Sequence, residues 1–252
     1  MYAVLPARAA RTIVAAGCAA ATLSPALHAR AASTAPVIQP GARITAGSTG
    51  CTAGWVFAGT GALRGNQFLG TAGHCVTGTG QPVYLTDGPF PVSFAHGLLI
   101  GTVAYKSTSY DFALIKIARN NLKYVNPSMA GHPNIPQRLG GASSARIGDI
   151  CQFSGHGVPF DGTATTEQSR EGVLSEIDAT QVYCDGPAYE GDSGGPMADV
   201  TSGNAAIALL DAVQATVGAT ADVGIQGVAL TAVLADTKRH GLPVRLRTVT
   251  VS

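Results

Sequence analysis

From Ile44 onward, short apolar runs alternate with clusters of glycine, proline, asparagine and aspartate. Short runs bounded by such turn-forming residues are typical of β-strands. The runs are Trp55-Val56-Phe57, Gln67-Phe68-Leu69, Val83-Tyr84-Leu85, Leu98-Leu99-Ile100, Phe112 to Ile117, Ile150 to Phe153, Gly172 to Ile177, Ala206 to Leu210 and Gly224 to Leu230. Their density along the chain predicts an all-β fold, a barrel or a sandwich.

One segment near the C-terminus has helical spacing instead. Leu230, Val233 and Leu234 lie at intervals that place them on one face of a helix, and a cationic stretch follows them. Gly241 comes just after these cations, and basic residues followed by glycine commonly end a helix. The pattern predicts a single helix at about residues 230–239.

Composition narrows the class of protein. Glycine accounts for 32 of the 252 residues, which favours many tight turns over long helices. Hydrophobic residues make up 46% of the chain, enough for a sizeable core, so wholesale disorder is excluded. The formal charge is +1 and no basic run is present, which argues against a nucleic-acid partner. No apolar stretch beyond the N-terminal segment is long enough to span a membrane.

The N-terminal segment resembles an export signal. Two arginines precede an Ala-rich apolar run from Thr12 to about Leu23, and Ala29-Arg30-Ala31 is a plausible cleavage site. We expect residues 1–31 to be a signal peptide and residues 32–43, which are small, polar and proline-containing, to be a linker or short pro-segment. The mature protein is then expected to be secreted.

Cysteine usage fits an exported chain. Cys18 lies in the leader, where a weak likeness to a lipoprotein box leaves lipid anchoring open as an alternative. The other cysteines are Cys51, Cys75, Cys151 and Cys184, and an even number in an exported protein implies two disulfides with three possible connectivities. No C-x-x-C pair is present, so a zinc site has little support, and we expect no metal or cofactor.

Three short motifs carry candidate chemistry. They are Thr71-Ala72-Gly73-His74-Cys75, Ser109-Tyr110-Asp111-Phe112-Ala113-Leu114-Ile115 and Glu190-Gly191-Asp192-Ser193-Gly194-Gly195-Pro196. A serine hydroxyl is a weak nucleophile that needs a neighbouring base, and the base needs a third group to hold its tautomer. His74 can accept the Ser193 proton near neutral pH, and Asp111 can orient His74. The N–H groups of Gly191 and Ser193 would form an oxyanion hole.

Each of these residues alone has an ordinary structural explanation. A histidine beside a cysteine is commonly structural, an aspartate before a strand commonly caps a turn, and the glycine-rich motif could be a hairpin loop. Their joint occurrence in this order, in an exported glycine-rich chain, favours catalysis over those explanations.

The three motifs resemble those of the trypsin/chymotrypsin-type serine protease family, and in particular its secreted bacterial members, over about residues 44–240. The resemblance implies two packed six-stranded antiparallel β-barrels, an active site between them and a C-terminal helix. His74 and Asp111 would belong to the first barrel and Ser193 to the second. The protease domain would span residues 44–242, with a crossing between barrels near 118–149 and a C-terminal extension at 243–252.

The resemblance also implies a disulfide pairing. Cys51 and Cys75 match the family pair that ties the histidine loop to a neighbouring strand. This pairing leaves Cys151 to bond with Cys184.

Substrate specificity departs from the trypsin pattern. The family's primary specificity position corresponds to Pro187, followed by Ala188, so the carboxylate that selects Lys or Arg is missing. Glu190 would lie at the rim of the pocket, and the implied P1 preference is a small or medium apolar side chain. The strand at 206–212 lacks the family's Ser-Trp-Gly, and its Asp211 would either approach Asp111 or face solvent.

Activation has two alternatives under the resemblance. Arg43-Ile44 resembles the activation junction, where a new N-terminus at Ile44 would pair with Asp192 and order the oxyanion loop. Some bacterial relatives use an arginine just after the second-barrel cysteine instead, but Gln152 occupies that position here. Arg146 or Arg170 would then be the substitute, and Arg43 could be an ordinary linker residue.

The remaining histidines have no assigned chemistry. His156 resembles a packing position in a family turn, and His96, His132 and His240 are expected to be surface or structural residues. The sequence therefore predicts a secreted, monomeric, cofactor-free serine endopeptidase acting on proteins or peptides. Two alternatives are a protease-fold binding protein without turnover and an esterase that uses the same triad.

Overall fold

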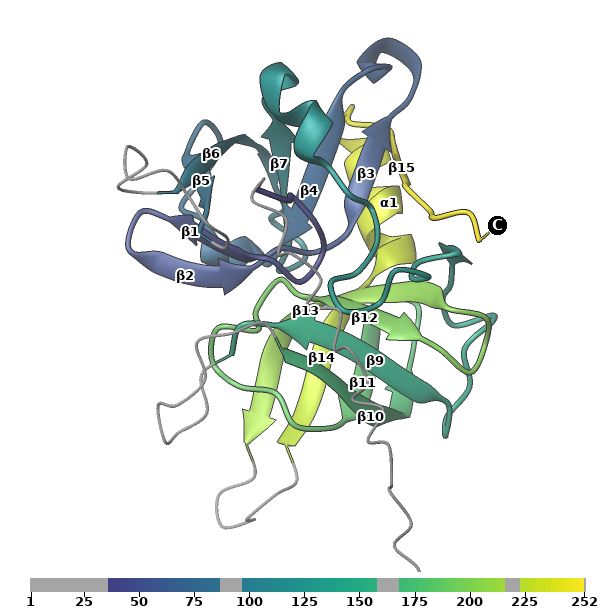
Figure 1. Ribbon diagram of the computed structural model, residues 1–252. Coiled ribbons are helices and arrows are strands. Elements are labelled where there is room, and N and C mark those ends of the chain that lie inside the picture. Colours follow the sequence, from purple (N-terminus) through teal and green to yellow (C-terminus); the bar gives the residue numbers. More distant parts are fainter. Residues whose placement is uncertain (1–35, 87–96, 158–167, 216–222, 252) are drawn as a thin grey trace, which may run out of the picture. The chain divides into compact units, whose positions relative to one another are not determined.

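A computed structural model describes residues 36–86, 97–157, 168–215 and 223–251 of the chain. These residues form two sheets, one α-helix and three short 3-10 helices (Figure 1). The predicted signal peptide at 1–31, the first part of the linker and His96 lie outside the described residues.

The first sheet has eight strands in the order β15-β3-β4-β7-β6-β5-β1-β2, and all neighbours are antiparallel. The strands are β1 (Arg43–Ala46), β2 (Thr49–Thr52), β3 (Val56–Gly59), β4 (Gln67–Thr71), β5 (Pro82–Leu85), β6 (Leu98–Lys106), β7 (Ala113–Ile117) and β15 (Val244–Leu246). The sheet has two strands more than the six expected, and one of them is β15 of the C-terminal extension, which joins it beside β3.

The second sheet has the order β12-β9-β10-β11-β14-β13-β8. Its strands are β8 (Arg138–Leu139), β9 (Ile150–Gly155), β10 (Gln168–Ile177), β11 (Gln181–Asp185), β12 (Pro196–Asp199), β13 (Ala205–Ala215) and β14 (Val223–Ala229). Because β12 also pairs with β13, six of these strands close into a barrel, and β8 adds to β13 in parallel. The predicted all-β double-barrel class is confirmed.

The predicted C-terminal helix is also confirmed. Helix α1 spans Leu230–Arg239, buries Leu230 and Val233, and is followed by Gly241 with a φ of 78°. The 3-10 helices are η1 (Gly61–Leu63), η2 (Gly73–Cys75) and η3 (Arg119–Tyr124). None of the helices in the described ranges has the length and apolar character needed to cross a membrane.

Three hydrophobic clusters form the core. Two lie within the sheets, one among β1–β7 and one among β9–β14. The third joins residues of both sheets to α1, with Trp55, Phe112 and Leu209 among its fully buried members. The indole N–H of Trp55 also donates a buried 2.8 Å hydrogen bond to the Ala208 carbonyl, across from the first sheet to the second. The seam between the sheets is thus a packed interior.

Residues 118–149 lead from β7 in the first sheet to β9 in the second and contain η3 and β8.

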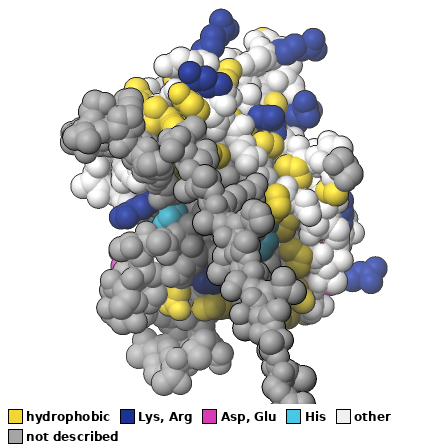
Figure 2. Space-filling model, in the orientation of Figure 1, with side chains coloured by type: hydrophobic (Ala, Val, Ile, Leu, Met, Phe, Trp, Pro, Cys, Tyr) yellow, Lys and Arg dark blue, Asp and Glu magenta, His cyan; other side chains and the backbone are white. Residues whose placement is uncertain are grey.

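Charged residues make up only 12% of the chain. Figure 2 shows the lysine and arginine side chains of the described residues at several separate places on one face, with apolar side chains between them.

Candidate active site

His74 and Asp111 meet at one edge of the first sheet. His74 lies on η2, directly after β4, and Asp111 lies directly before the core residue Phe112 and β7, which pairs with β4. The His74 backbone N–H donates to Asp111 Oδ1 at 2.7 Å, and His74 Nδ1 lies 2.6 Å from Asp111 Oδ2. Gly73 permits this approach, since a Cβ there would lie 2.7 Å from Asp111 Oδ1. The carboxylate therefore holds both the backbone and the ring of His74.

Electrostatics in this pair favour a charged Asp111 and a basic His74. The hydrogen bond to Asp111 raises the pKa of His74, against the opposing effect of burial, and the charges of Asp111 and Asp211 raise it further. Burial alone would raise the pKa of Asp111, but the hydrogen bond and charge of His74 hold it below its ordinary value. A neutral His74 that donates from Nδ1 to the carboxylate keeps Nε2 as its proton acceptor.

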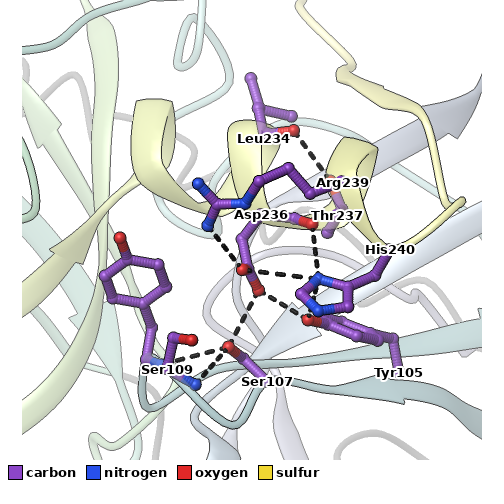
Figure 3. Close-up of polar contacts among 9 residues, drawn as sticks. Tyr105, Ser107, Ser109, Leu234, Asp236, Thr237, Arg239 and His240 are labelled. Atoms are coloured by element: carbon purple, nitrogen blue, oxygen red, sulfur yellow. Dashed lines mark hydrogen bonds and ion pairs between the residues drawn. The ribbon is translucent and has the colours of Figure 1, made fainter.

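The turn that ends at Asp111 is fastened to α1 by a buried carboxylate (Figure 3). Ser107 Oγ accepts the N–H groups of Ser109 and Tyr110 at 3.2 and 3.1 Å and donates to Asp236 Oδ2 at 2.9 Å. Asp236 is fully buried and also accepts hydrogen bonds from Tyr105 and Arg239. The C-terminal helix thereby fixes the backbone that precedes Asp111.

Ser193 lies in the segment between β11 and β12 and is held against the first sheet. Its carbonyl oxygen accepts the Thr52 N–H at 2.9 Å and lies 3.7 Å from Cys75 Sγ, on the residue that follows His74. Gly194 has a φ of 88°, and a Cβ there would lie 2.5 Å from the Thr52 carbonyl, so only glycine fits. The structure therefore brings the backbone of Ser193 beside η2, which carries His74.

The backbone around Ser193 is turned so that some donors remain available. Gly191 has a φ of 103°, and its carbonyl accepts the Thr52 hydroxyl at 2.8 Å. Within the described residues, neither the Gly191 N–H nor the Ser193 N–H donates a hydrogen bond. Both N–H groups can therefore serve an incoming oxyanion.

In the uncut chain Asp192 is paired with Arg170, one of the two arginines considered as a substitute for a new N-terminus at Ile44. Arg170 Nη2 lies 2.5 Å from Asp192 Oδ1, and the N–H groups of Gly157 and Tyr189 donate to the same carboxylate at 2.6 and 2.8 Å. Ile44 instead lies buried in β1, between β2 and β5. In the uncut chain its nitrogen is part of a peptide bond inside the sheet, so it supplies no ammonium group.

Arg170 reaches Asp192 from a neighbouring strand. Its place on β10 is opposite Phe153 on β9, and its guanidinium stacks over the Phe153 and Tyr189 rings at 5.3 and 5.2 Å. Gln152, at the position where some relatives carry the cation, binds Ser169 and the Arg170 carbonyl instead. The other alternative, Arg146, is exposed.

The predicted specificity residues follow β11. Pro187 and Glu190 are exposed, while Ala188 is buried in the core of the second barrel. Of the two alternatives for Asp211, the structure shows burial near Asp111. The residue is 7% exposed and interacts electrostatically with Asp111 and His74. Burial, followed by the charge of Asp111, raises the pKa of Asp211 to about 6.

Both expected disulfides are present, the one that the family resemblance implies and the one that follows from it by elimination. Cys51 bonds to Cys75 and Cys151 bonds to Cys184. The Cys51 and Cys75 sulfurs lie within 4.8 Å of a His74 ring nitrogen, a spacing that metal ligands could adopt. Because the two sulfurs are bonded to each other, they have no thiolate to offer a metal.

Several residues that hold the site were not found from the sequence. Thr52 bridges Gly191 and the His156 N–H through its hydroxyl, and Asp236 anchors the turn before Asp111. Neither lies in a recognisable motif, because their partners are more than 100 residues away along the chain. The half-exposed side chain of His240 contacts Asp236 and the Tyr105 hydroxyl, as a structural residue would.

The fold described above is similar to that of a solved protease. The crystal structure of Thermobifida fusca Protease A has a TM-score of 0.58 and 19% identity, covering 84% of this chain and 100% of that one. A Glu endopeptidase in complex with MPD has a TM-score of 0.46 and 19% identity, covering 79% of this chain and 88% of that one. No curated protein sequence matches the chain. The sequence model of the Trypsin family matches residues 38–217, which is most of the chain. The chain therefore belongs to the trypsin family.

Proposed function

We propose that this trypsin-family chain is a secreted serine endopeptidase that acts through an acyl-enzyme on Ser193. The observation that carries the proposal is the double contact of Asp111 with the backbone and ring of His74, beside the segment that bears Ser193. In this family such a pair activates serine for attack on a peptide carbonyl. The leader at 1–31 and the two disulfides support export.

Each proposed step uses groups of this chain. His74 Nε2 takes the Ser193 hydroxyl proton as the serine oxygen bonds to the scissile carbonyl carbon, and Asp111 stabilises the imidazolium that forms. The N–H groups of Gly191 and Ser193 bind the oxyanion. His74 then gives the proton to the leaving amine. A water attacks the ester by the same route, which releases the acid and restores Ser193.

The proposed enzyme has an ordered oxyanion loop without a new N-terminus. Asp192 already has Arg170 as its cation, and Ile44 is held inside β1. We therefore expect activity from a chain in which the bond after Arg43 is intact. An intact mass measured on active protein tests this, and activity confined to chains that begin at Ile44 would contradict it.

For specificity, we propose a small or medium apolar P1 residue. Pro187 and Ala188 bring no charge to the family's specificity position, and the acids nearest to it along the chain are Asp185 and Glu190, both exposed. Peptide substrates that differ only at P1 test this. Faster cleavage after lysine or arginine than after alanine, valine or leucine would contradict it.

The central test is labelling by a fluorophosphonate probe, followed by intact mass. We expect a single adduct on the native chain and none on Ser193→Ala. Absence of an adduct on correctly folded native protein would favour the protease-fold binding alternative. Comparison of a peptide with the matching ester then separates an endopeptidase from an esterase.

A further inference from the structure

The inference concerns Asp211, a buried carboxyl group that the proposed mechanism does not use. In β13, Leu210 pairs with Gly227 and Ala212 pairs with Gln226, so Asp211 is the extra residue of a β-bulge. Bulges redirect a side chain out of the regular alternation and are frequent beside active sites. The regular pairing of β13 with β14 is thus interrupted at one residue, Asp211.

The bulge is tied directly to the backbone that carries Ser193. The Leu210 carbonyl accepts the Gly194 N–H at 2.6 Å, and the Leu210 N–H donates to the Gly195 carbonyl at 2.9 Å. Asp211 follows Leu210 and is within electrostatic reach of both Asp111 and His74. The candidate site therefore contains a third ionisable side chain close to its base.

Asp211 has little to stabilise a negative charge. Its side chain is more than nine-tenths buried, and its Oδ1 atom has no hydrogen-bond partner within the described residues. The nearby charged groups are the Asp111 carboxylate, which disfavours ionisation, and His74, which favours it; the Gln181 amide also favours it. Lys106 acts on Asp111 and His74. A buried carboxyl with few donors beside a second carboxylate holds its proton more tightly than usual.

We propose that Asp211 is a positioning residue that acts through the Asp111–His74 pair: the charge on its carboxyl group sets how readily His74 accepts the Ser193 proton. This proposal rests on the proposed function for its catalytic meaning. As the pH rises, one proton leaves the Asp211 carboxyl for solvent, and two carboxylates rather than one then act on His74. The second negative charge makes His74 a stronger base.

The direction of the effect follows from the charge. The negative charge of Asp211 raises the pKa of His74, so replacing Asp211 by a neutral side chain lowers it. The acid limb of the kcat/KM profile, which reports protonation of the free base, then moves to lower pH. In Asp211→Asn, the ratio of kcat/KM at pH 5.5 to its plateau value should rise at least about twofold.

The first measurement needs no variant and no turnover. In the native chain with isotope-labelled histidine, the His74 ring resonances should titrate in two steps, one from the ring and a smaller one at about pH 6 from Asp211. A single step with no inflection in that range overturns the proposal. Because this signal does not depend on activity, it remains informative if fluorophosphonate labelling fails and the proposed function is wrong.

The variants then separate charge from shape. Asp211→Asn and Asp211→Ser differ in size but both lack the charge, so they should shift the acid limb alike and remove the smaller NMR step. Glu176→Gln, an exposed carboxylate on β10, is the matched control and should leave both measurements unchanged. If native protein labels normally but both Asp211 variants keep the native profile, the proposal fails while the proposed function stands. If neither variant folds, the titration of the native chain decides.

Discussion

Replacing Arg170 by methionine tests whether its ion pair with Asp192 keeps the proposed oxyanion loop, the segment around Asp192, in place. The change keeps most of the alkyl chain and removes the cation that lies 2.5 Å from Asp192 Oδ1. The two side chains are 9% and 1% exposed, so water cannot replace the lost partner freely. Asp192 would keep only the N–H donors of Gly157 and Tyr189 among the described contacts. The variant therefore leaves a buried carboxylate without a counter-ion.

The magnitude follows from burial. Removing one partner of a buried ion pair commonly destabilises a protein by about 3–5 kcal/mol, which is a large part of the stability of a typical domain. If about 3 kcal/mol of this loss falls on the loop itself, the equilibrium constant for ordering the loop drops by about 100-fold, since each 1.4 kcal/mol is a factor of ten. We expect fluorophosphonate labelling of Arg170→Met to slow by up to about that factor.

The assay combines urea unfolding with the rate of probe labelling. Arg119→Met, at an exposed position on η3, is the control for loss of an arginine and should change neither quantity. Adding Asp192→Asn to Arg170→Met should recover part of the stability, because a neutral amide does not need a cation. Native labelling and a native unfolding midpoint in Arg170→Met would refute the reasoning, as would a double variant in which the two losses simply add.

Three further perturbations test the framework around the site. Replacing both Cys51 and Cys75 by alanine opens a loop with a sequence separation of 24 residues, and should lower the free energy of unfolding in urea by about 3.5 kcal/mol; an unchanged midpoint would contradict this. Gly54→Ala would place a methyl group 2.6 Å from a backbone carbonyl oxygen at the seam between the sheets and should lower both stability and labelling, whereas Gly78→Ala, which has open space, should alter neither. Burial would raise the pKa of Asp236, but its hydrogen bonds hold the pKa below the ordinary value, so its contribution to stability is present above about pH 4 and is lost as the pH falls through the folded pKa. Asp236→Asn should therefore lose less stability than the native chain between about pH 6 and pH 3 in urea melts, and equal losses would argue against it.

The sequence predicted the parts of the molecule that depend on local pattern. Each of the nine apolar runs overlaps a strand, although Trp55 and Phe112 lie just before theirs and Leu230 is the first residue of α1. The runs could be recognised because the pattern of apolar residues between turns depends only on neighbouring positions. Strands such as β12 and β15 were not predicted, since each is short and β12 begins at a proline while β15 directly follows one. β15 exists because an edge of the first sheet is available to the C-terminal extension.

The residues of the candidate site also differ in how far local sequence reveals them. His74, Asp111 and Ser193 could be proposed from the sequence because each lies in a compact motif. The partner of Asp192 could only be narrowed to alternatives, because it depends on strand register: Arg170 lies opposite Phe153 on the neighbouring strand, 22 residues before Asp192. A cation that lies on a neighbouring strand of the barrel has no fixed sequence separation from the carboxylate that it pairs with.

Three carboxylates near the seam show why burial alone does not decide charge. Burial raises the pKa of Asp111, Asp211 and Asp236 alike. Asp236 receives hydrogen bonds from Tyr105, Ser107 and Arg239, and Asp111 receives two from His74, so both end with a pKa below the ordinary value.

Asp211 has no such set of donors in the described part of the chain and faces the charge of Asp111, so its pKa rises to about 6. The number of donors aimed at each carboxylate, together with its charged neighbours, thus separates two carboxylates that are ionised near neutral pH, Asp111 and Asp236, from one that titrates closer to neutrality. Asp211 is the member of the three whose charge changes in the range where His74 must lose its proton, which is why a change confined to Asp211 should alter the pH dependence of the reaction and leave its chemistry in place.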